Sequence, residues 1–353
     1  MEGVDYILSD GRMWHLDMRK MIEAGIDVNR MAQMFASGKA SGEIISLLGG
    51  KLQQVSDFSM PMPISSSNPI KVFLRNQLTG NPIIAGSSLK GAIRSILFTF
   101  LRERGETRNN EVFGNLNDGS DFMRFIRVGD IEFPHKSTEL VNTKIFNLGG
   151  GQGHWIGGWK HKGGFASETT TQFNETGFNT IYECLPVGRE SNGYIMMSDI
   201  AFENARKVIK VADNPKKSEI INSNIDMLCR IINAHTKKYL DKELQFFKKF
   251  QQAENAYYLY EDENDFSGGI VILQGEFTDL KPNECILKMS AGAGFHSITG
   301  DWQFDNYYSG TLDQKHNKGA KPKSRKIAIT HEEDDMFLDL MGFVKLSFEE
   351  VEA

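Results

Sequence analysis

The pattern of hydrophobic and polar positions predicts short strands at both ends of the chain and helices between them. Near the N-terminus, residues 4–8 and 13–16 predict two strands that turn at Asp10-Gly11, because strand-like stretches flank a turn dipeptide. Asp17 follows the second strand, where its side chain can cap a helix. The chain is therefore expected to begin with a strand pair and a helix.

Prolines mark the segment that follows and lower its helical content: Pro61, Pro63 and Pro69. Beyond them, the pattern predicts strands over 70–74, 82–84 and 125–131, with a helix over 89–102. Between residues 149 and 164, eight of sixteen residues are glycine, so no regular element is expected there. Two more strands are expected over 181–185 and 194–197.

The stretch between Gly193 and Gly268 has a different pattern. It contains one proline and no glycine, and apolar residues recur at helical spacing: Ile221, Ile225, Leu228, Ile231 and Ile232. We interpret it as two or three packed helices inserted into the chain. Strands are expected again over 269–273, 285–289, 326–329 and 342–348. This order favours an α+β fold, with domains over residues 1–192, 193–268 and 269–353.

Composition places the chain among ordinary globular proteins. It has 353 residues, 40% of them hydrophobic, and 40 Lys and Arg against 46 Asp and Glu, a formal charge of −6. These values exclude collagen-like, disordered and membrane-spanning chains, and they count against a globally basic nucleic-acid binder. The charge is uneven, however. Residues 71–108 hold seven basic and two acidic residues, and residues 315–326 hold six basic residues and no acidic one. A polyanion would therefore be bound locally, at these basic blocks.

Residues 332–339 hold five acidic residues and no basic one, and we expect a solvent-exposed loop or a face for a basic partner. The cysteines are too far apart for a C-x-x-C motif: Cys184, Cys229 and Cys285. The N-terminus lacks an apolar signal-peptide core, and no run of 18 apolar residues occurs. We expect a reduced, cytoplasmic protein without a membrane segment, a metal site or a cofactor.

Segment 83–94 carries the clearest chemical pattern. A strand runs into a turn at Gly86, and a serine is then expected to cap the following helix, whose free N–H groups favour an anion. Lys90 and Arg94 lie four residues apart, so their side chains share one helical face. This predicts a phosphate-binding loop and helix made of Gly86, Ser87, Ser88, Lys90, Gly91 and Arg94. The alternative is a capped helix with two solvated cations.

The glycine-rich stretch 149–164 is a second candidate. Its aromatic side chains could stack on bases and its lysines could contact phosphates: Trp155, Trp159, Lys160 and Lys162. The alternative is a surface loop whose tryptophans pack into the body. His154 and His161 have no cysteine or acidic ligand nearby, so a metal site is not expected.

Two more segments could meet RNA. Small residues in 290–297 would allow close approach of another backbone, and the candidates there are Gly292, Gly294, Phe295 and His296. The basic block 315–326 ends in Arg325 and Lys326. His296 stands beside Ser297, but no third member of a catalytic triad is evident in the sequence.

Segment 84–94, which reads I-x-G-S-S-L-K-G-A-I-R, resembles the signature of the RAMP superfamily, RNA-binding subunits of CRISPR effector complexes. Other motifs follow in the order that superfamily shows: Val112-Phe113-Gly114, Arg127-Val128-Gly129-Asp130, and Glu183-Cys184-Leu185-Pro186-Val187-Gly188. Together with the 290–297 loop and the tail at 322–326 and 341–346, they are similar to the type III-A (Csm) subunits that cap the 3′ end of the guide RNA.

The resemblance implies two ferredoxin-like (RRM-like) domains with a helical insertion, and a non-catalytic role. It implies guide RNA (crRNA), target RNA and a backbone RAMP subunit as partners. It assigns RNA contact to 86–94 and 290–297, and 149–164 stands where RAMP subunits carry a flexible thumb. Family members usually begin with one more strand. We therefore expect that strand to be missing, encoded upstream, or supplied by another chain.

Two alternatives stay open on the sequence. The chain could be a metal-independent endoribonuclease that processes guide precursor RNA, with His296 or His154 as general base. It could also be a backbone RAMP subunit that cleaves target RNA through a loop aspartate and Mg²⁺. The acidic residues Asp130, Glu183 and Asp199 show no paired-carboxylate spacing that favours the second.

Overall fold

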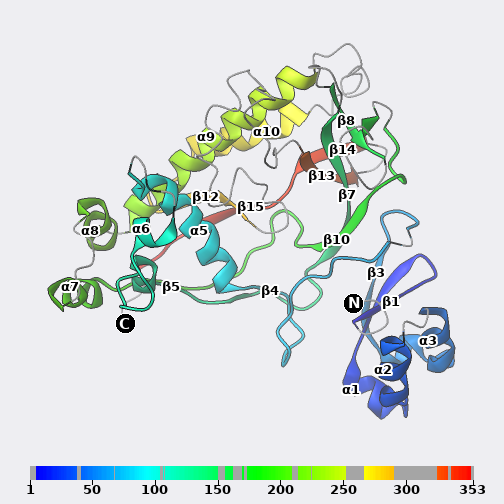
Figure 1. The fold of residues 1–353 in the computed structure, drawn as a ribbon. Helices are drawn as coiled ribbons and strands as arrows, with labels where there is room; N and C mark the ends of the chain where they lie inside the picture. Colours follow the sequence, from blue (N-terminus) through cyan, green and yellow to red (C-terminus); the bar gives the residue numbers. More distant parts are fainter. Residues whose placement is uncertain are drawn as a thin grey trace. The chain divides into compact units, whose positions relative to one another are not determined.

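A computed structural model describes most of the chain (Figure 1). The described residues are 5–37, 41–66, 68–103, 106, 108–149, 156–161, 169–170, 173–208, 214–223, 225–251, 266–289, 324–332 and 335–350. They form two compact units that interleave along the sequence. Unit 1 comprises residues 1–83, 132–144 and 174–191, and unit 2 comprises residues 84–131, 145–173 and 192–353. The division into domains over residues 1–192, 193–268 and 269–353 stays a prediction.

Unit 1 begins with a three-stranded antiparallel sheet of β1 (Tyr6–Ser9), β2 (Arg12–Leu16) and β3 (Ser56–Pro61). Asp10 and Gly11 turn the first hairpin with φ of 53° and 68°, a conformation that asparagine, aspartate and glycine tolerate best. The Asp17 side chain accepts hydrogen bonds from two backbone N–H groups at the start of α1 (Met18–Glu23). The predicted strand pair and helix cap are thus confirmed.

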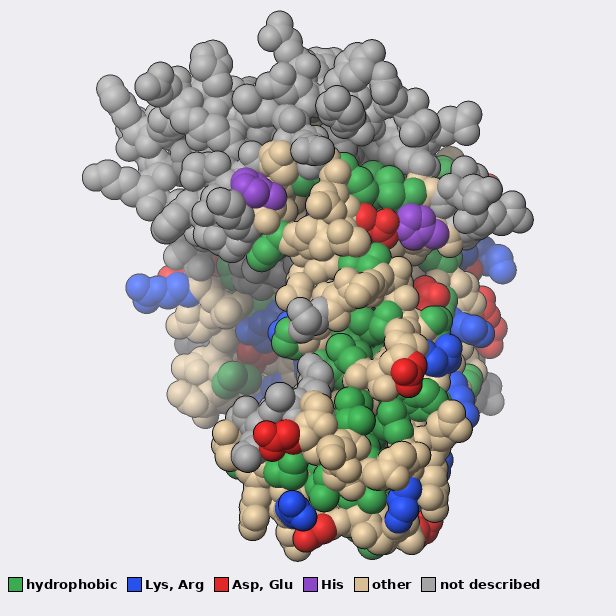
Figure 2. Space-filling view, turned by 90° about the vertical axis from the view of Figure 1, so that its right-hand side faces the viewer, with side chains coloured by type: hydrophobic (Ala, Val, Ile, Leu, Met, Phe, Trp, Pro, Cys, Tyr) green, Lys and Arg blue, Asp and Glu red, His purple; other side chains and the backbone are tan. Residues whose placement is uncertain are grey.

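Helices α1, α2 (Val28–Ala36), α3 (Ser41–Leu48) and α4 (Leu52–Val55) pack beside this sheet (Figure 1). Part of the surface of unit 1 is apolar, and hydrophobic side chains gather between charged ones at its lower end in Figure 2. In the same unit, β10 (Thr180–Cys184) pairs with the first part of β7 (Glu139–Gly149). The Tyr6 hydroxyl accepts a hydrogen bond from the Ile70 N–H at 2.7 Å, which ties β1 to the chain just after Pro69.

Unit 2 is built around α5 (Gly86–Leu101) and the 27-residue helix α9 (Ile225–Gln251). Their apolar faces share one core with the strand pair β5 (Ile126–Val128) and β11 (Ile195–Met197), and with the pair β12 (Glu284–Lys288) and β15 (Phe343–Ser347). Shorter helices complete this part of unit 2: α6 (Asn109–Phe113), α7 (Asp199–Val208), α8 (Pro215–Asn222) and two 3₁₀ turns at Phe122–Phe125 and Glu276–Thr278. The predicted helical stretch after Gly193 is confirmed.

A second sheet in unit 2 has the strand order β14 (Asp335–Leu340), β13 (Ser324–Glu332), β7, β8 (Ile156–Lys160) and β9 (Thr169–Thr170). Helix α10 (Phe266–Gly275) and α9 cover its apolar side chains. A last short pair joins β4 (Ile83–Ile84) to β6 (Ile131–Glu132). The whole is a mixed α+β fold with antiparallel sheets, as expected for ferredoxin-like RAMP domains.

Four predicted elements differ in the structure. Residues 269–273 lie in helix α10 and not in a strand, because the apolar run packs against α9 and β14. The acidic stretch 332–339 contributes strand β14, and residues 156–160 of the glycine-rich stretch form β8. Residues 70–74 form only an isolated bridge from Lys71 to Tyr182.

Candidate nucleic-acid interface

The start of α5 lies directly against the end of β5. A Cβ added at Gly86 would sit 2.3 Å from the Val128 carbonyl oxygen and 2.7 Å from the backbone of Gly129, so only glycine fits there. Ala85 occupies the N-cap position without a side-chain cap. The Gly86 N–H instead donates to the Asp130 carboxylate at 2.7 Å. The expected serine cap is therefore replaced by a carboxylate from a later segment.

This arrangement changes where an anion can bind. Asp130 takes the first N–H of the helix, so a phosphate would meet the following residues and the cationic side chains rather than a vacant helix end. Ser87, Ser88 and Gly91 are exposed. They are on the solvent side of the first two turns, while Leu89 is buried in the core.

Arg94 is held in place by a buried carboxylate. Both terminal guanidinium nitrogens lie 3.4 Å from Asp121 Oδ2, and the guanidinium carbon lies 4.4 Å above the centre of the Phe113 ring. Asp121 is 2% exposed, and it also accepts a hydrogen bond from the Met123 N–H at 2.8 Å. Arg94 thus serves first as the counter-ion of Asp121, a role that its spacing from Lys90 did not reveal.

Lys90 lies one helical turn before Arg94 and remains partly exposed. Burial lowers the pKa of Lys90, Asp121 raises it, and the charges of Arg94 and Arg127 lower it further. Two neighbouring cations, Arg94 and Arg127, therefore act on Lys90 at the first turns of α5. A phosphate placed among them would relieve this repulsion.

The outward face of the β5–β11 pair extends this cationic region. Met196 pairs with Arg127 across the two strands, and the Gly129 N–H donates to the Tyr194 carbonyl at 3.0 Å. Ile126 and Val128 point into the core, so the alternation of a strand turns Arg127 outward.

Tyr194 and Met196 are 65% and 51% exposed on this strand pair. The Tyr194 ring covers Gly129, because a Cβ there would sit 2.4 Å from a ring carbon. The strand pair thus carries an exposed aromatic ring and Arg127, and the charge of Arg127 acts on Lys90 of α5. A stacking surface and phosphate-binding cations are the two properties needed to bind single-stranded RNA. We name Lys90, Arg127, Tyr194 and Met196 the α5–β5 face. The alternation of apolar and polar residues over 126–128 could have predicted that Arg127 points outward, but not that it lies beside β11.

The profile of the RAMP superfamily matches residues 37–304. The chain belongs to the RAMP superfamily. A search of curated proteins gives no match. Among solved structures, a chain described as "Cryo-EM structure of Csm-crRNA-target RNA ternary complex in type III-A CRISPR-Cas system" is similar with a TM-score of 0.53 at 15% identity, covering 99% of this chain and 95% of that one. A T. onnurineus Csm5 crystal structure gives a TM-score of 0.45 at 14% identity, with 82% and 85% covered.

Trp159 of this RAMP protein does not lie at the surface. It is 1% exposed, and its ring makes edge contacts with Phe146 and Phe173 at 5.8 and 5.0 Å between centroids. The alternation of β8 turns Trp159 into the core of the second sheet, so it is a core residue and not a stacking surface. Lys160, next to it, is partly exposed.

Arg325 also differs from the expectation of RNA contact. It is 6% exposed, its guanidinium donates a hydrogen bond to the buried Glu243 carboxylate, and it lies 3.9 Å above the Phe246 ring. Burial and pairing therefore assign Arg325 to the core. Lys326 is partly exposed on the same strand. The remaining predicted RNA-contacting residues lie outside the described part of the chain: Trp155, Lys162, Gly292, Gly294, Phe295 and His296.

Glu183, part of the third RAMP motif, has a structural role in unit 1. Its carboxylate pairs with Arg75, accepts hydrogen bonds from the Thr138 hydroxyl at 2.6 Å and the Phe73 N–H at 2.9 Å, and lies 3.7 Å from His15 Nε2. Burial raises its pKa, but His15, Arg75 and these donors together hold the pKa at about 2.

Neither a metal centre nor a membrane segment is found in the described residues. No group of three or more His, Cys, Asp or Glu side chains is arranged there to hold a metal ion. No described helix is both long enough and apolar enough to cross a membrane.

Proposed function

We propose that this RAMP protein is a non-catalytic RNA-binding subunit of a type III-A CRISPR effector complex in the cytoplasm. It would hold the 3′ end of the guide RNA and contact the neighbouring backbone RAMP subunit. Support comes from the superfamily match, from the α5–β5 face, and from the fold shared with a chain whose structure is described as a Csm complex with crRNA and target RNA. The position at the 3′ end rests on the motifs of the sequence.

The α5–β5 face is the observation that carries the proposal. Lys90 on α5 and Arg127 on β5 offer positive charge at a partly exposed and an exposed position, whereas Arg94 is paired with Asp121. Tyr194, next to strand β11 that pairs with β5, offers an exposed ring. None of these groups forms the fixed pattern of donors and acceptors that reads a base. Phosphate contacts and stacking hold RNA without sequence preference, which suits a protein that must accept any guide.

The test is RNA binding by Lys90→Ala/Arg127→Ala, two substitutions that leave the Arg94–Asp121 pair intact. Each phosphate contact to single-stranded RNA contributes about 0.7 to the slope of log affinity against log salt, so the double variant should reduce that slope by about 1.4. A matched control is Arg206→Ala/Lys207→Ala, which removes two exposed cations from α7. Equal affinities and slopes for the two variants would contradict the proposed face.

Placement in the complex needs a separate experiment. The chain is co-expressed with its neighbouring genes, and the guide RNA in the complex is digested with and without this subunit. We expect the guide to be shortened from its 3′ side when the subunit is omitted. Loss of protection at the 5′ side would contradict the placement. Cleavage of a repeat-containing transcript by the purified chain in EDTA would contradict the non-catalytic role.

A further inference from the structure

A buried lysine lies in unit 2, away from any described carboxylate partner. Lys288 ends β12 and is 6% exposed. Its ammonium lies 5.1 Å from the centre of the Tyr239 ring and 4.7 Å from that of Phe343. Within the described residues it has no hydrogen bond and no ion pair, although an ammonium group has three donors. Glu243, the described carboxylate that acts on it, is bonded to Arg325 instead.

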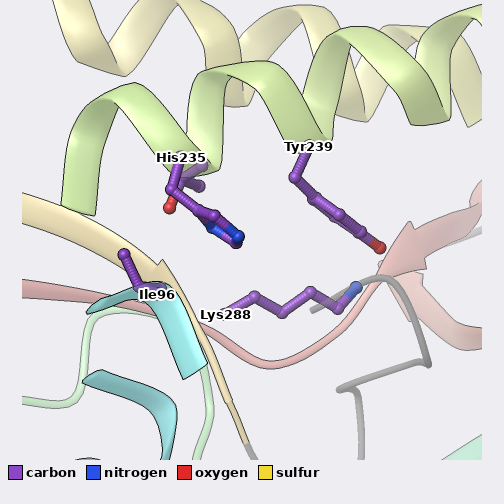
Figure 3. Close-up of a pocket in the computed structure, with 5 residues that line it drawn as sticks. Ile96, His235, Tyr239 and Lys288 are labelled. Atoms are coloured by element: carbon purple, nitrogen blue, oxygen red, sulfur yellow. The ribbon is translucent and has the colours of Figure 1, made fainter. Parts of the chain in front are cut away.

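A small cavity opens beside this lysine. It measures about 10 Å³ and is lined by Ile96, His235, Thr236, Tyr239 and Lys288. In Figure 3 the His235 and Tyr239 side chains descend from α9 toward Lys288, and Ile96 closes the side formed by α5. Such a volume holds about one water-sized atom. Four of the lining side chains, those of His235, Thr236, Tyr239 and Lys288, carry hydrogen-bond donors, so the cavity suits a single oxygen that carries negative charge.

Hydrogen bonds between α9 and β12 fix the walls of this cavity. The Asn233 amide group of α9 accepts from the Ile286 N–H at 3.0 Å and donates to the Glu284 carbonyl at 2.9 Å. This clamps α9 along the edge of β12 opposite to β15, and the one-turn spacing of His235 and Tyr239 then places both over Lys288. Burial lowers the pKa of Lys288 to about 8, with Glu243 raising it and Arg325 lowering it. The ammonium therefore stays mostly charged at neutral pH in a place where an unpaired charge is costly.

We propose that this pocket binds one oxygen of a tetrahedral oxyanion, a phosphate group, on the Lys288 ammonium, with His235 and Tyr239 as flanking donors. The phosphate could belong to an RNA backbone or be free inorganic phosphate. This site is separate from the α5–β5 face, and its test does not depend on the proposed function.

The probe is inorganic sulfate, which has the same tetrahedral shape and keeps its charge near neutral pH. The melting temperature of the full chain is followed with increasing sulfate against chloride at equal ionic strength. We expect a sulfate-dependent rise for the wild type and a loss of affinity of about tenfold or more in Lys288→Met. Lys345→Met is the control, since this lysine lies on the adjacent strand but is 49% exposed. If the wild type shows no rise beyond that in chloride, the site is refuted and the cavity holds water.

RNA binding identifies the source of the phosphate. If sulfate competes with RNA in the wild type but not in Lys288→Met, the pocket belongs to an RNA-binding surface. If RNA affinity is the same in both proteins while sulfate affinity differs, the pocket takes a free anion. Both outcomes support an oxyanion site.

Should Lys288→Met fail to fold, the pH dependence of sulfate binding by the wild type tests the same point. The groups that face the ammonium are His235, Tyr239, Glu243 and Arg325. Sulfate affinity should fall as the pH rises from about 7 to about 9.5, because the ammonium loses its proton near pH 8. An affinity that is constant over this range would refute the site.

Discussion

Replacing Arg94 should destabilise the protein even in the absence of RNA. Arg94→Met keeps the apolar stem of the side chain but leaves Asp121, 2% exposed, without its counter-ion. A pair 3.4 Å apart gains about 5 kcal/mol at an effective dielectric of about 20, before desolvation is subtracted. Removing one partner of a buried pair costs about 3–5 kcal/mol, and since the Arg94 side chain is 27% exposed we expect about 2 kcal/mol here. Contact with the Phe113 ring adds about 0.5 kcal/mol.

The assay is thermal unfolding of the wild type, Arg94→Met, Asp121→Asn and the double variant. A loss of about 2 kcal/mol corresponds to a decrease of about 5 °C in melting temperature. Asp121→Asn removes the buried charge but keeps an oxygen for the Met123 N–H, so the double variant should regain most of the loss. If Arg94→Met lowers the melting temperature equally with and without Asp121→Asn, the ion pair is not the cause.

Three further predictions follow from the same geometry. Gly86→Ala should cost about 2 kcal/mol in unfolding experiments because its Cβ would meet backbone atoms at 2.3 Å, whereas Gly91→Ala, with open space around it, should stabilise α5 by about 0.5–1 kcal/mol; equal effects would contradict the close approach. Glu183 has a folded pKa of about 2, below its ordinary value of 4.5. Its stabilisation of about 3 kcal/mol is therefore present above pH 4.5 and is lost as the pH falls toward 2. In urea unfolding, the stability difference between wild type and Glu183→Gln should shrink by about 1.5 kcal/mol at about pH 3.5. Trp159→Ala should lower the free energy of unfolding by about 3–5 kcal/mol, and a stable variant with weakened RNA binding would instead indicate a stacking residue.

Local signals in the sequence identified the elements whose structure is locally determined. The hairpin at Asp10-Gly11, the Asp17 cap and helix α5 depend on residues a few positions apart, and all three are present. Residues 269–273 show the limit of this approach. A short apolar run fits a buried strand or a buried helix equally well, and contact with α9 and β14 decides for a helix.

The acidic stretch differs from its predicted structure for another reason. Counting the charges of residues 332–339 concealed an alternation of apolar residues at Met336, Leu338 and Leu340. These side chains pack in the core of the second sheet, where β14 pairs with β13. The glycines around Trp159 likewise predict an irregular loop, but in β8 its ring packs in the core against Phe146.

The sequence predicts the part of the candidate site that lies on one helix, but not the part that tertiary packing adds. Spacing along one helix places Lys90 and Arg94 on one side, and this is a property of the α-helix itself. Asp121, Asp130 and Tyr194 reach the same place through tertiary packing across 27 or more residues, which periodicity does not encode. Tertiary packing therefore gives the two predicted cations different roles: Arg94 neutralises a buried carboxylate, and Lys90 faces solvent.

Photochemical cross-linking of the assembled complex, followed by mass spectrometry, tests the central claim most directly. The claim predicts cross-links from the 3′ part of the guide RNA to peptides that contain Lys90, Arg127 and Tyr194. Cross-links confined to the 5′ part of the guide, or their absence from all three of these peptides while other regions of this chain are cross-linked, would contradict it.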